Sequence, residues 1–408
     1  MDIYEIMNNR FDATLFPMPT DEESKDAEKL TQYYLEHSFF RDFVYRNPDR
    51  TKGKEFCDAL IIFDDTLIIV QNKACLSLRS PKAWSEKNIN SALKQLCGSY
   101  RMIKNGIVKR FYNETLKFGI EIDLSKYTSI YGLVILSIKS EPYDPFPLII
   151  SSNEPDISYN IMSLEDLIHS SNKMDTAGDF IVYLELRADA RKYGFIPLVN
   201  NEEKNMYSLV SFIPKVLNKK LENINEAARI KTLDKYEIKL INGLKNNEDY
   251  EFSLLFDDMI ARAHDIDKDR YGSEESACLA AHKVAEVLGY VTRERRIELG
   301  KRMYSNANKA VSGSIEITVH LQRQIKTIYL YIYTGMPRVE RTPFLQAIAI
   351  AAQSKYGYNR IFAVATEPIG SGRSYDYVFI DDNTISKAPE VIKAMIELLP
   401  DLGKEELI

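Results

Sequence analysis

The sequence predicts a mixed α/β protein with an α/β sandwich at its N-terminus, a mainly helical middle region and a second α/β region at its C-terminus. Near both ends of the chain, short apolar runs bounded by turn residues alternate with amphipathic stretches of helical period. Between these ends the helical period continues without strand-like runs. The 408 residues are enough for two or three domains, each with its own core. We therefore expect domains at residues 1–160, 161–259 and 260–408.

The first domain is expected to open with a helix over Asp21–His37, because acidic residues at its start suit the helix dipole. Three strands should follow, at Phe39–Tyr45, Phe56–Phe63 and Leu67–Val70. The last two are apolar on both faces, which is typical of central strands, and a short polar break between them predicts a hairpin. A helix over Asn88–Lys104 and strands at Ile130–Ile138 and Pro147–Ile150 complete the expected sheet.

The middle region should be helical. A capping box begins at Ser163, and further helices are expected at Asp175–Ala190, Tyr207–Leu217 and Leu221–Leu244. In the last domain we expect helices at Glu274–Leu288, Pro343–Lys355 and Ala388–Leu399. Its strands are expected at Ser314–Leu321, Thr327–Tyr333, Arg360–Ala365 and Tyr375–Ile380.

Composition excludes several classes of protein. The chain has 53 basic and 59 acidic residues, a net charge of -6, and 45% hydrophobic residues, which excludes a disordered chain or a collagen-like repeat. The acidic balance argues against a protein that coats nucleic acid over its whole surface, but it leaves room for a local basic site. Four scattered cysteines, a polar N-terminus and the lack of a long apolar stretch predict reduced thiols, a cytoplasmic location and no membrane association.

Three polar residues stand beside the expected hairpin. Asp58 falls near the start of its first strand, and Gln71 and Lys73 follow the second. Residues two apart on a strand share a face, so Gln71 and Lys73 point the same way, and hairpin pairing brings them close to Asp58. Asp58 or Lys73 alone is most simply a solvated residue at a strand end. The spaced set favours a site, because burying such groups costs free energy unless they pair or bind a ligand.

With these residues the segment over about residues 20–105 resembles the PD-(D/E)XK nuclease superfamily. The family carries an acid on one strand, a short connection and then (D/E)-x-K on the next, after a helix that often holds a Glu. Asp58 matches the first acid and Lys73 the lysine, whereas Gln71 stands where an acid is usual. This Q-x-K form is similar to the Mrr-like branch and to the nuclease-related NERD-type domain. The resemblance implies a restriction-endonuclease-like α/β/α sandwich.

The resemblance also implies metal-assisted hydrolysis of a phosphodiester, with Mg²⁺ or Mn²⁺ as the cofactor. Asp58 would be the principal ligand, with the Gln71 amide oxygen and the Asn72 backbone carbonyl as further ligands. Lys73 would orient the attacking water or stabilise charge on the phosphate.

A supporting acid is expected from one of three glutamates. Glu28 ranks first because it lies on the helix that precedes the strands, where the resemblance places a family Glu. Glu55 ranks second, although regular strand alternation would direct it away from Asp58 unless a bulge intervenes. Glu36 ranks third. The alternative for each is an exposed carboxylate, and for Glu36 we prefer that alternative.

Basic residues gather just after the hairpin. Between Lys73 and Arg110 there are nine basic residues and one acid, Glu86, a net charge of +8 in an acidic protein. We expect nucleic-acid contacts from Lys87, Lys94, Gln95 and Arg101 on the helix that follows the hairpin. The alternative is a solvated helix face, but such faces usually mix both signs of charge.

These observations predict a Mg²⁺-dependent endodeoxyribonuclease, and the resemblance is consistent with bacterial defence, antiviral or restriction roles. DNA is the expected partner, and a homo-oligomer is compatible with the sequence. Two alternatives stay open. The first is a catalytically weak nuclease fold that only binds DNA, because Gln71 replaces an acid. The second is an interaction or sensor protein that acts through its C-terminal domain.

Overall fold

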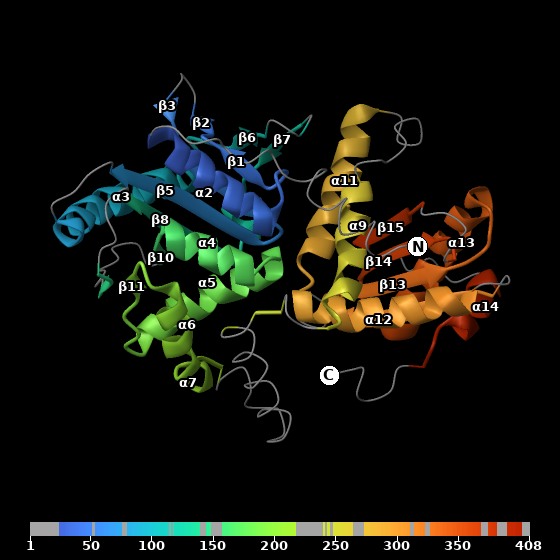
Figure 1. Cartoon of the computed structure of the whole chain (residues 1–408). Helices are drawn as coiled ribbons and strands as arrows, with labels where there is room; N and C mark the ends of the chain where they lie inside the picture. The colour runs from blue at the N-terminus through green and yellow to red at the C-terminus, as the bar shows by residue number, and fades with distance from the viewer. Residues whose placement is uncertain are drawn as a thin grey trace. The chain divides into compact units, whose positions relative to one another are not determined.

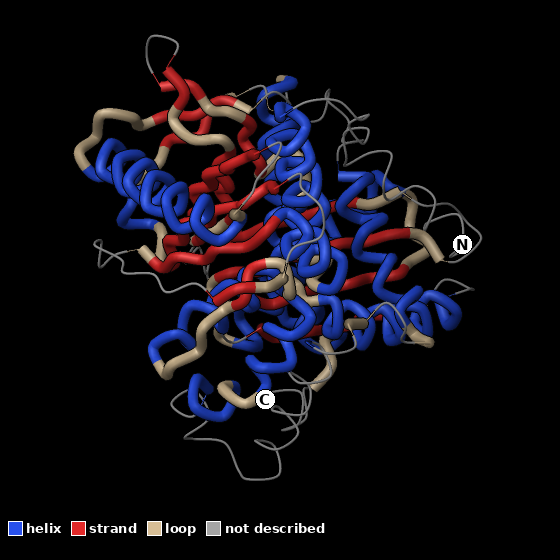
Figure 2. The backbone as a smooth tube through the Cα atoms, turned by 60° about the vertical axis from the view of Figure 1, so that its left-hand side comes forward, coloured by secondary structure: helices blue, strands red, loops and turns tan. Residues whose placement is uncertain are grey.

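In the structure, a computed structural model, the chain divides into two units. The structure describes residues 24–50, 54–75, 80–113, 116, 118–138, 144–147, 157–217, 240, 243–244, 248–263, 273–310, 314–322, 327–368, 374–381 and 390–401. The N-terminal unit comprises Phe11–Asn247 and Asp267–Arg293, and the C-terminal unit comprises Glu248–Ile266 and Glu294–Ile408. Helices and strands are distributed along the described chain (Figure 2), and both units contain both.

A five-stranded mixed sheet forms the centre of the N-terminal unit (Figure 1). Its spatial order is β1 (Val44–Arg46), β4 (Ala59–Phe63), β5 (Thr66–Cys75), β8 (Ser129–Ile138) and β10 (Ser158–Ser163). β4 is antiparallel to both of its neighbours, whereas β5, β8 and β10 run parallel to one another. The expected mixed α/β architecture with a central sheet is therefore confirmed.

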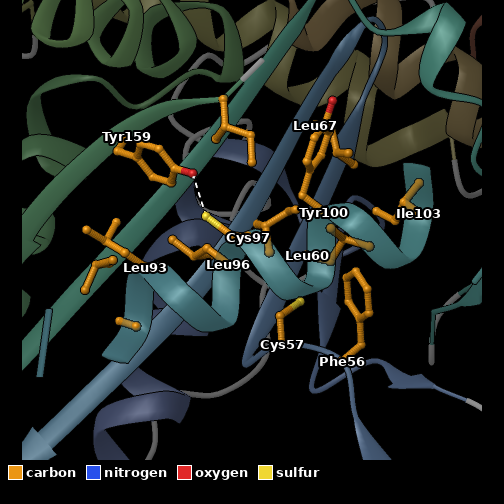
Figure 3. Close-up of a cluster of buried hydrophobic side chains, with 14 of the residues drawn as sticks. Phe56, Cys57, Leu60, Leu67, Leu93, Leu96, Cys97, Tyr100, Ile103 and Tyr159 are labelled. Atoms are coloured by element: carbon orange, nitrogen blue, oxygen red, sulfur yellow. Dashed lines mark hydrogen bonds between the residues drawn. The ribbon is translucent and has the colours of Figure 1, made fainter. Parts of the chain in front are cut away.

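Helix α3 (Pro81–Lys104) covers one face of this sheet. Leu93, Leu96 and Tyr100 on the helix pack against sheet residues such as Leu60 and Leu67 (Figure 3). A Cys97–Tyr159 contact of 3.1 Å joins the helix to β10 inside the same cluster. Because side chains alternate along a strand, the side chains at even positions of β4 and odd positions of β5 face α3.

The opposite face is covered by α2 (Ser24–Phe39), α4 (Leu164–Lys173) and α5 (Ala177–Lys192). At the end of α2, the Phe39 ring lies 5.9 Å from that of Phe63 and 5.6 Å from that of Phe180. Helix α11 (Glu274–Gly289) belongs to this unit as well, with His282 stacked on Phe43 at 4.3 Å between ring centroids.

Smaller elements surround the sheet. Three two-stranded sheets pair β2 (Asp49–Arg50) with β3 (Lys54–Glu55), β6 (Arg110–Tyr112) with β7 (Gly119–Glu121), and β9 (Phe146–Pro147) with β11 (Leu198–Val199). The other helices among the described residues of this unit are η1 (Leu124–Lys126), α6 (Glu202–Val210) and α7 (Ile213–Leu217).

The C-terminal unit contains a four-stranded sheet of order β12 (Glu316–Gln322), β13 (Thr327–Tyr333), β14 (Arg360–Thr366) and β15 (Asp376–Asp381). Only the β13–β14 pair is parallel, and α13 (Arg338–Tyr356) connects these two strands. α13 and α14 (Glu390–Leu398) pack on one face through an aliphatic core. The unit also holds η3 (Tyr250–Ser253), α9 (Leu254–Ala263) and α12 (Arg293–Lys309), whose Arg296 pairs with Asp257 of α9 at 2.7 Å.

Most of the expected elements are present, with shifted ends. β13 has its predicted bounds, and the capping box at Ser163 is confirmed by hydrogen bonds in both directions between Ser163 and Asp166. α3 begins seven residues earlier than expected, because Pro81 opens the helix rather than ending a loop. α9, α12 and β10 are additional to the expected elements. The helix expected at Leu221–Leu244 lies largely outside the described residues.

One expected strand is wrong, and another lies mostly outside the described residues. Most of Phe39–Tyr45 is not a strand, because α2 runs to Phe39 and Phe40 adopts a left-handed backbone with φ of 62°. The aromatic residues of this segment, Phe39, Phe40 and Phe43, are buried at the end of α2 and in the turn that follows it. Of the strand expected at Pro147–Ile150 only Pro147 is described, and it lies in β9, which pairs with β11. Among the described strands, β10 takes the edge of the central sheet beside β8.

The two units divide the chain differently from the expected domains. Residue 160 falls inside β10, and α4 and α5 then pack back on the central sheet. α11 lies beyond residue 260 but belongs to the N-terminal unit. None of the four cysteines forms a disulfide bond, and no helix in the described part of the chain is long and apolar enough to cross a membrane.

Two helical glycines of the N-terminal unit give a matched test of the packing. A Cβ at Gly178 in α5 would lie 2.2 Å from the Tyr290 carbonyl oxygen, whereas a Cβ at Gly98 in α3 meets nothing within 4 Å. We expect Gly178→Ala to lower the free energy of unfolding by roughly 1–3 kcal/mol through overpacking. Gly98→Ala should raise it by about 0.5–1 kcal/mol through helix propensity. Urea unfolding of both variants measures this, and equal effects would contradict the α5–α11 packing.

A buried histidine makes the C-terminal unit sensitive to acid. Burial, and then the charges of Arg295 and Arg302, lower the pKa of His320 from 6.5 to about 3. Between these pH values the unfolded chain binds a proton that the folded chain does not, so stability falls as the pH drops through this window. His320→Gln should flatten the pH dependence of urea unfolding between pH 6.5 and pH 4. An unchanged slope would show that His320 is not the group responsible.

Candidate functional site

The candidate site lies where β5 extends beyond β4. The β4–β5 pairing ends at Ala59 opposite Val70, so residues 71–75 of β5 have no partner on β4. On their other side these residues remain paired with β8, with Gln71 opposite Val134. The backbone edge of β5 that faces away from β8 is therefore open to side chains at this point.

Asp58 immediately precedes β4 and is held by several hydrogen bonds. Its N–H donates to the Val70 carbonyl at 3.2 Å, and its carbonyl accepts from the Asn47 N–H at 3.1 Å. The Gln32 side chain on α2 donates to the same carbonyl at 2.8 Å. The Asp58 carboxylate accepts a hydrogen bond from the Asn72 N–H. These contacts fix the carboxylate against the open edge of β5, as the hairpin predicts.

Asn72 joins this edge to α2. Its side-chain nitrogen donates to the Ala27 carbonyl at 3.1 Å and to the Thr31 hydroxyl at 2.7 Å. Its side-chain oxygen is buried and accepts no hydrogen bond from the residues that the structure describes. A buried acceptor without a donor costs roughly 1–3 kcal/mol unless water or a cation satisfies it. The site therefore holds an oxygen in need of a partner.

Gln71 and Lys73 lie on the α3 side of the sheet, in line with the odd residues Leu67 and Ile69 of the core. Gln71 is buried, with 4% of its surface exposed. The Lys73 ammonium donates to the Gln95 side-chain oxygen of α3 at 2.6 Å. Gln95, which was expected from the sequence to contact DNA, therefore contacts Lys73.

The three glutamates have different surroundings. Glu28 is half-buried on α2, next to Ala27 and one helical turn before Gln32, both of which reach the site. Glu36 is fully buried and forms a bidentate pair with Arg46 at 2.7 and 2.8 Å. Glu55 lies in β3, but its side chain is outside the described part of the structure.

The basic residues of α3 form an exposed stripe. Lys87, Lys94 and Arg101 are seven residues apart along the helix, so they share one side of it, and all three are exposed. Lys104 is also exposed, with its ammonium 5.5 Å from the centre of the Tyr100 ring. Gln95 directly follows Lys94, which places the stripe beside the Lys73 contact.

The Asp58 carboxylate and the Asn72 backbone carbonyl are oxygen donors of the kind that a hard divalent cation prefers, and Mg²⁺ commonly uses only one or two carboxylates with several waters. The Gln71 side chain lies on the α3 side of the sheet, whereas the Asn72 side chain is bonded to α2 on the other side. A residue's N–H and C=O point to the same edge of a strand, so the Asn72 carbonyl faces the edge where its N–H meets Asp58. No group of three His, Cys, Asp or Glu side chains able to hold a metal is found among the described residues.

Comparison with known proteins identifies no relative of this chain. No family model, curated protein or solved structure matches the chain.

Two positioning residues were not found from the sequence. Gln32 holds the Asp58 carbonyl and also donates to the Asn47 side chain at 2.6 Å. Asn47 has a left-handed backbone with φ of 39°, which turns the chain after β1 toward Asp58. The position of Gln32, four residues after Glu28 on one helix side, was the available signal. Nothing local to Asn47 marks its contact with Asp58.

The pairing with Arg46 predicts that Glu36 is a structural residue. Glu36→Gln should lower the free energy of unfolding by about 2 kcal/mol, because it removes the charge from a buried, bidentate hydrogen-bonded pair. Glu86→Gln, an exposed change on α3, should stay within about 0.5 kcal/mol of wild type. Urea unfolding measures both, and a Glu36→Gln variant as stable as the Glu86→Gln control would contradict this role.

Proposed function

We propose that the N-terminal unit is a restriction-endonuclease-like domain of PD-(D/E)XK type, and that the protein is a metal-dependent nuclease that cuts DNA internally. One observation carries the proposal. The Asp58 carboxylate contacts the backbone of β5 between Gln71 and Lys73, the two residues of the Q-x-K motif. Asp58 and Gln71 are 13 positions apart in the sequence. The acid and the Q-x-K motif nevertheless lie at the same edge of β5.

The order of elements supports the same fold. A helix, three sheet strands, a helix and a further strand follow one another as α2, β1, β4, β5, α3 and β8. The four strands are neighbours in this order within the sheet, and helices pack on both faces. Glu28 is on the helix that precedes the first of these strands, where the family often carries a Glu.

Each polar residue has a distinct role in this proposal. Asp58, with the Gln71 amide and the Asn72 carbonyl, would hold Mg²⁺ or Mn²⁺. A bound divalent cation would supply positive charge to stabilise the phosphate during hydrolysis. Lys73, oriented by Gln95, would place its ammonium group on the attacking water or on a phosphate oxygen. Gln32 and Asn47 would position Asp58 through its backbone.

The exposed stripe of α3 would hold the DNA backbone. Lys87, Lys94 and Arg101 offer charges along one side of the helix, next to the residue that contacts Lys73. Each phosphate that they neutralise would release condensed counterions, so binding would weaken as salt rises. A cytoplasmic role in bacterial defence or restriction belongs to the proposal through the family resemblance.

A second candidate is a nuclease fold that binds DNA without cutting it. The specific observation in its favour is the low negative charge of the site, where Asp58 is accompanied by the neutral Gln71. One oxygen of Asp58 is already engaged by the Asn72 N–H. A neutral amide in place of a carboxylate weakens attraction for a cation.

Cleavage of supercoiled plasmid DNA with Mg²⁺ or Mn²⁺ tests the proposal. We expect Asp58→Asn and Lys73→Met each to lower the rate at least about 100-fold, because they remove the charged groups nearest the phosphate. Gln71→Glu should raise metal affinity in calorimetry, because it adds a carboxylate beside Asp58. Lys126→Gln, an exposed change on η1 of the same unit, should cut like wild type.

The outcomes separate the two candidates. Equal cleavage by wild type, Asp58→Asn and Lys73→Met would show that these residues do not form the active site. If wild type binds a DNA duplex tightly without cutting it, and Gln71→Glu gains cleavage, the protein is a nuclease fold that only binds DNA. Fluorescence anisotropy of the duplex measures binding separately from hydrolysis.

A further inference from the structure

An exposed tyrosine lies on the short β6–β7 sheet of the N-terminal unit. Tyr112 is the last residue of β6 and has 69% of its surface exposed, whereas the neighbouring Phe111 is buried, with its ring 5.0 Å from that of Phe56. Side chains alternate along a strand, so the burial of Phe111 directs Tyr112 and Arg110 to the outer face of the sheet. The Tyr112 ring therefore lies outside the hydrophobic core that anchors its strand.

The Tyr112 ring is held in place although it is exposed. It lies over Gly119 on β7, where a Cβ would be 2.8 Å from Cε1 of the ring and 2.9 Å from its Cζ. The absence of a side chain at position 119 allows this close approach. The Arg110 side chain donates to the Gly119 carbonyl at 3.2 Å, and its guanidinium carbon is 5.6 Å from the centre of the ring. One side of the ring thus rests on the strand, while most of its surface faces solvent.

The ring follows the basic stripe of α3 along the chain. β6 begins six residues after α3 ends, and the Ile107 N–H donates to the Met102 carbonyl at 2.9 Å, which folds the connection back on the last turn of the helix. The stretch Lys87–Tyr112 contains six basic residues and no acid. One acid of β7, Glu121, lies opposite Arg110. The segment as a whole therefore suits a partner with a run of negative charge and flat apolar groups, which a nucleic-acid strand provides.

We propose that Tyr112 stacks on an unpaired base of the DNA whose phosphates the α3 stripe holds. This inference rests on the proposed function and narrows its substrate to DNA with an unpaired strand. Aromatic side chains stack on every kind of base, because each base has a π-face. Within a continuous duplex the neighbouring base pairs already cover both faces of each base, so a protruding ring stacks only where a base is unpaired. The ring is already held by Gly119 and Arg110, which lowers the cost of ordering it on binding.

Fluorescence anisotropy in EDTA, with a duplex that carries a single-stranded tail and the same duplex with blunt ends, tests this proposal without hydrolysis. We expect wild type to bind the tailed duplex about tenfold more tightly, a typical gain from stacking of one base. Tyr112→Leu should remove this difference, whereas Tyr112→Phe keeps the ring and should retain it. Tyr207→Leu, the same change at an exposed tyrosine of α6, should behave like wild type.

A 2-aminopurine base in the tail reports the contact directly, because its fluorescence falls when it stacks on an aromatic ring. Wild type and Tyr112→Phe should quench this fluorescence, and Tyr112→Leu should not. A ring over a strand glycine also stabilises its hairpin, so urea unfolding accompanies each variant. The tail preference of wild type tests the inference without any variant.

Equal affinity of wild type for the two duplexes would overturn the inference, as would binding to neither, or quenching by Tyr112→Leu equal to that by wild type. Failure of the nuclease gives a different result. If Asp58→Asn cuts plasmid like wild type while Tyr112→Leu loses the tail preference, the proposed active site is wrong and the stacking site stands. If Asp58→Asn loses cleavage but wild type shows no tail preference, only the stacking site is wrong.

Discussion

The hydrogen bond from the Asn72 N–H to the Asp58 carboxylate is the interaction on which the candidate site depends. It forms where β5 extends beyond the end of β4. The Asp58 side chain there accepts the hydrogen bond of the Asn72 N–H, which a carbonyl of a neighbouring strand would otherwise accept. The partner is a carboxylate rather than a carbonyl, and negative charge is therefore held at the edge of an apolar sheet. Because the Asp58 backbone is itself bonded to Val70, Asn47 and Gln32, the position of that charge follows from the register of the hairpin and from the packing of α2.

Helix α3 links the stability of this unit to its chemistry. One side of the helix buries Leu96 and Tyr100 in the core, the adjoining side presents Gln95 to Lys73, and the exposed side carries the basic stripe. The hydrophobic packing that orders the helix therefore also sets the position of the Lys73 ammonium. A substitution in the hydrophobic core that rotates α3 would move Gln95 and alter its hydrogen bond to Lys73, although no polar residue of the site is replaced.

Sequence reasoning succeeded where local patterns decide the outcome. Strand alternation was enough to place Gln71 and Lys73 on one side of the sheet, and the capping box was enough to begin α4 at Ser163. It did not find contacts made across long stretches of chain. α12 has a highly charged sequence, and its buried Arg296 pairs with Asp257, 39 residues earlier. β10 is short and contains polar residues, so its place in the sheet depends on pairing with β8 rather than on its own composition.

The position of α11 has a consequence for the ancestry of this chain. The helix lies between two segments of the C-terminal unit in sequence, yet its His282 and Gly289 pack on Phe43 and Phe63 of the N-terminal unit. Neither unit is encoded by one continuous stretch of gene. Recombination that exchanged one whole unit for another would need several simultaneous crossover points, around residues 247, 266 and 293. The two units are therefore expected to have been inherited together, rather than shuffled as separate modules.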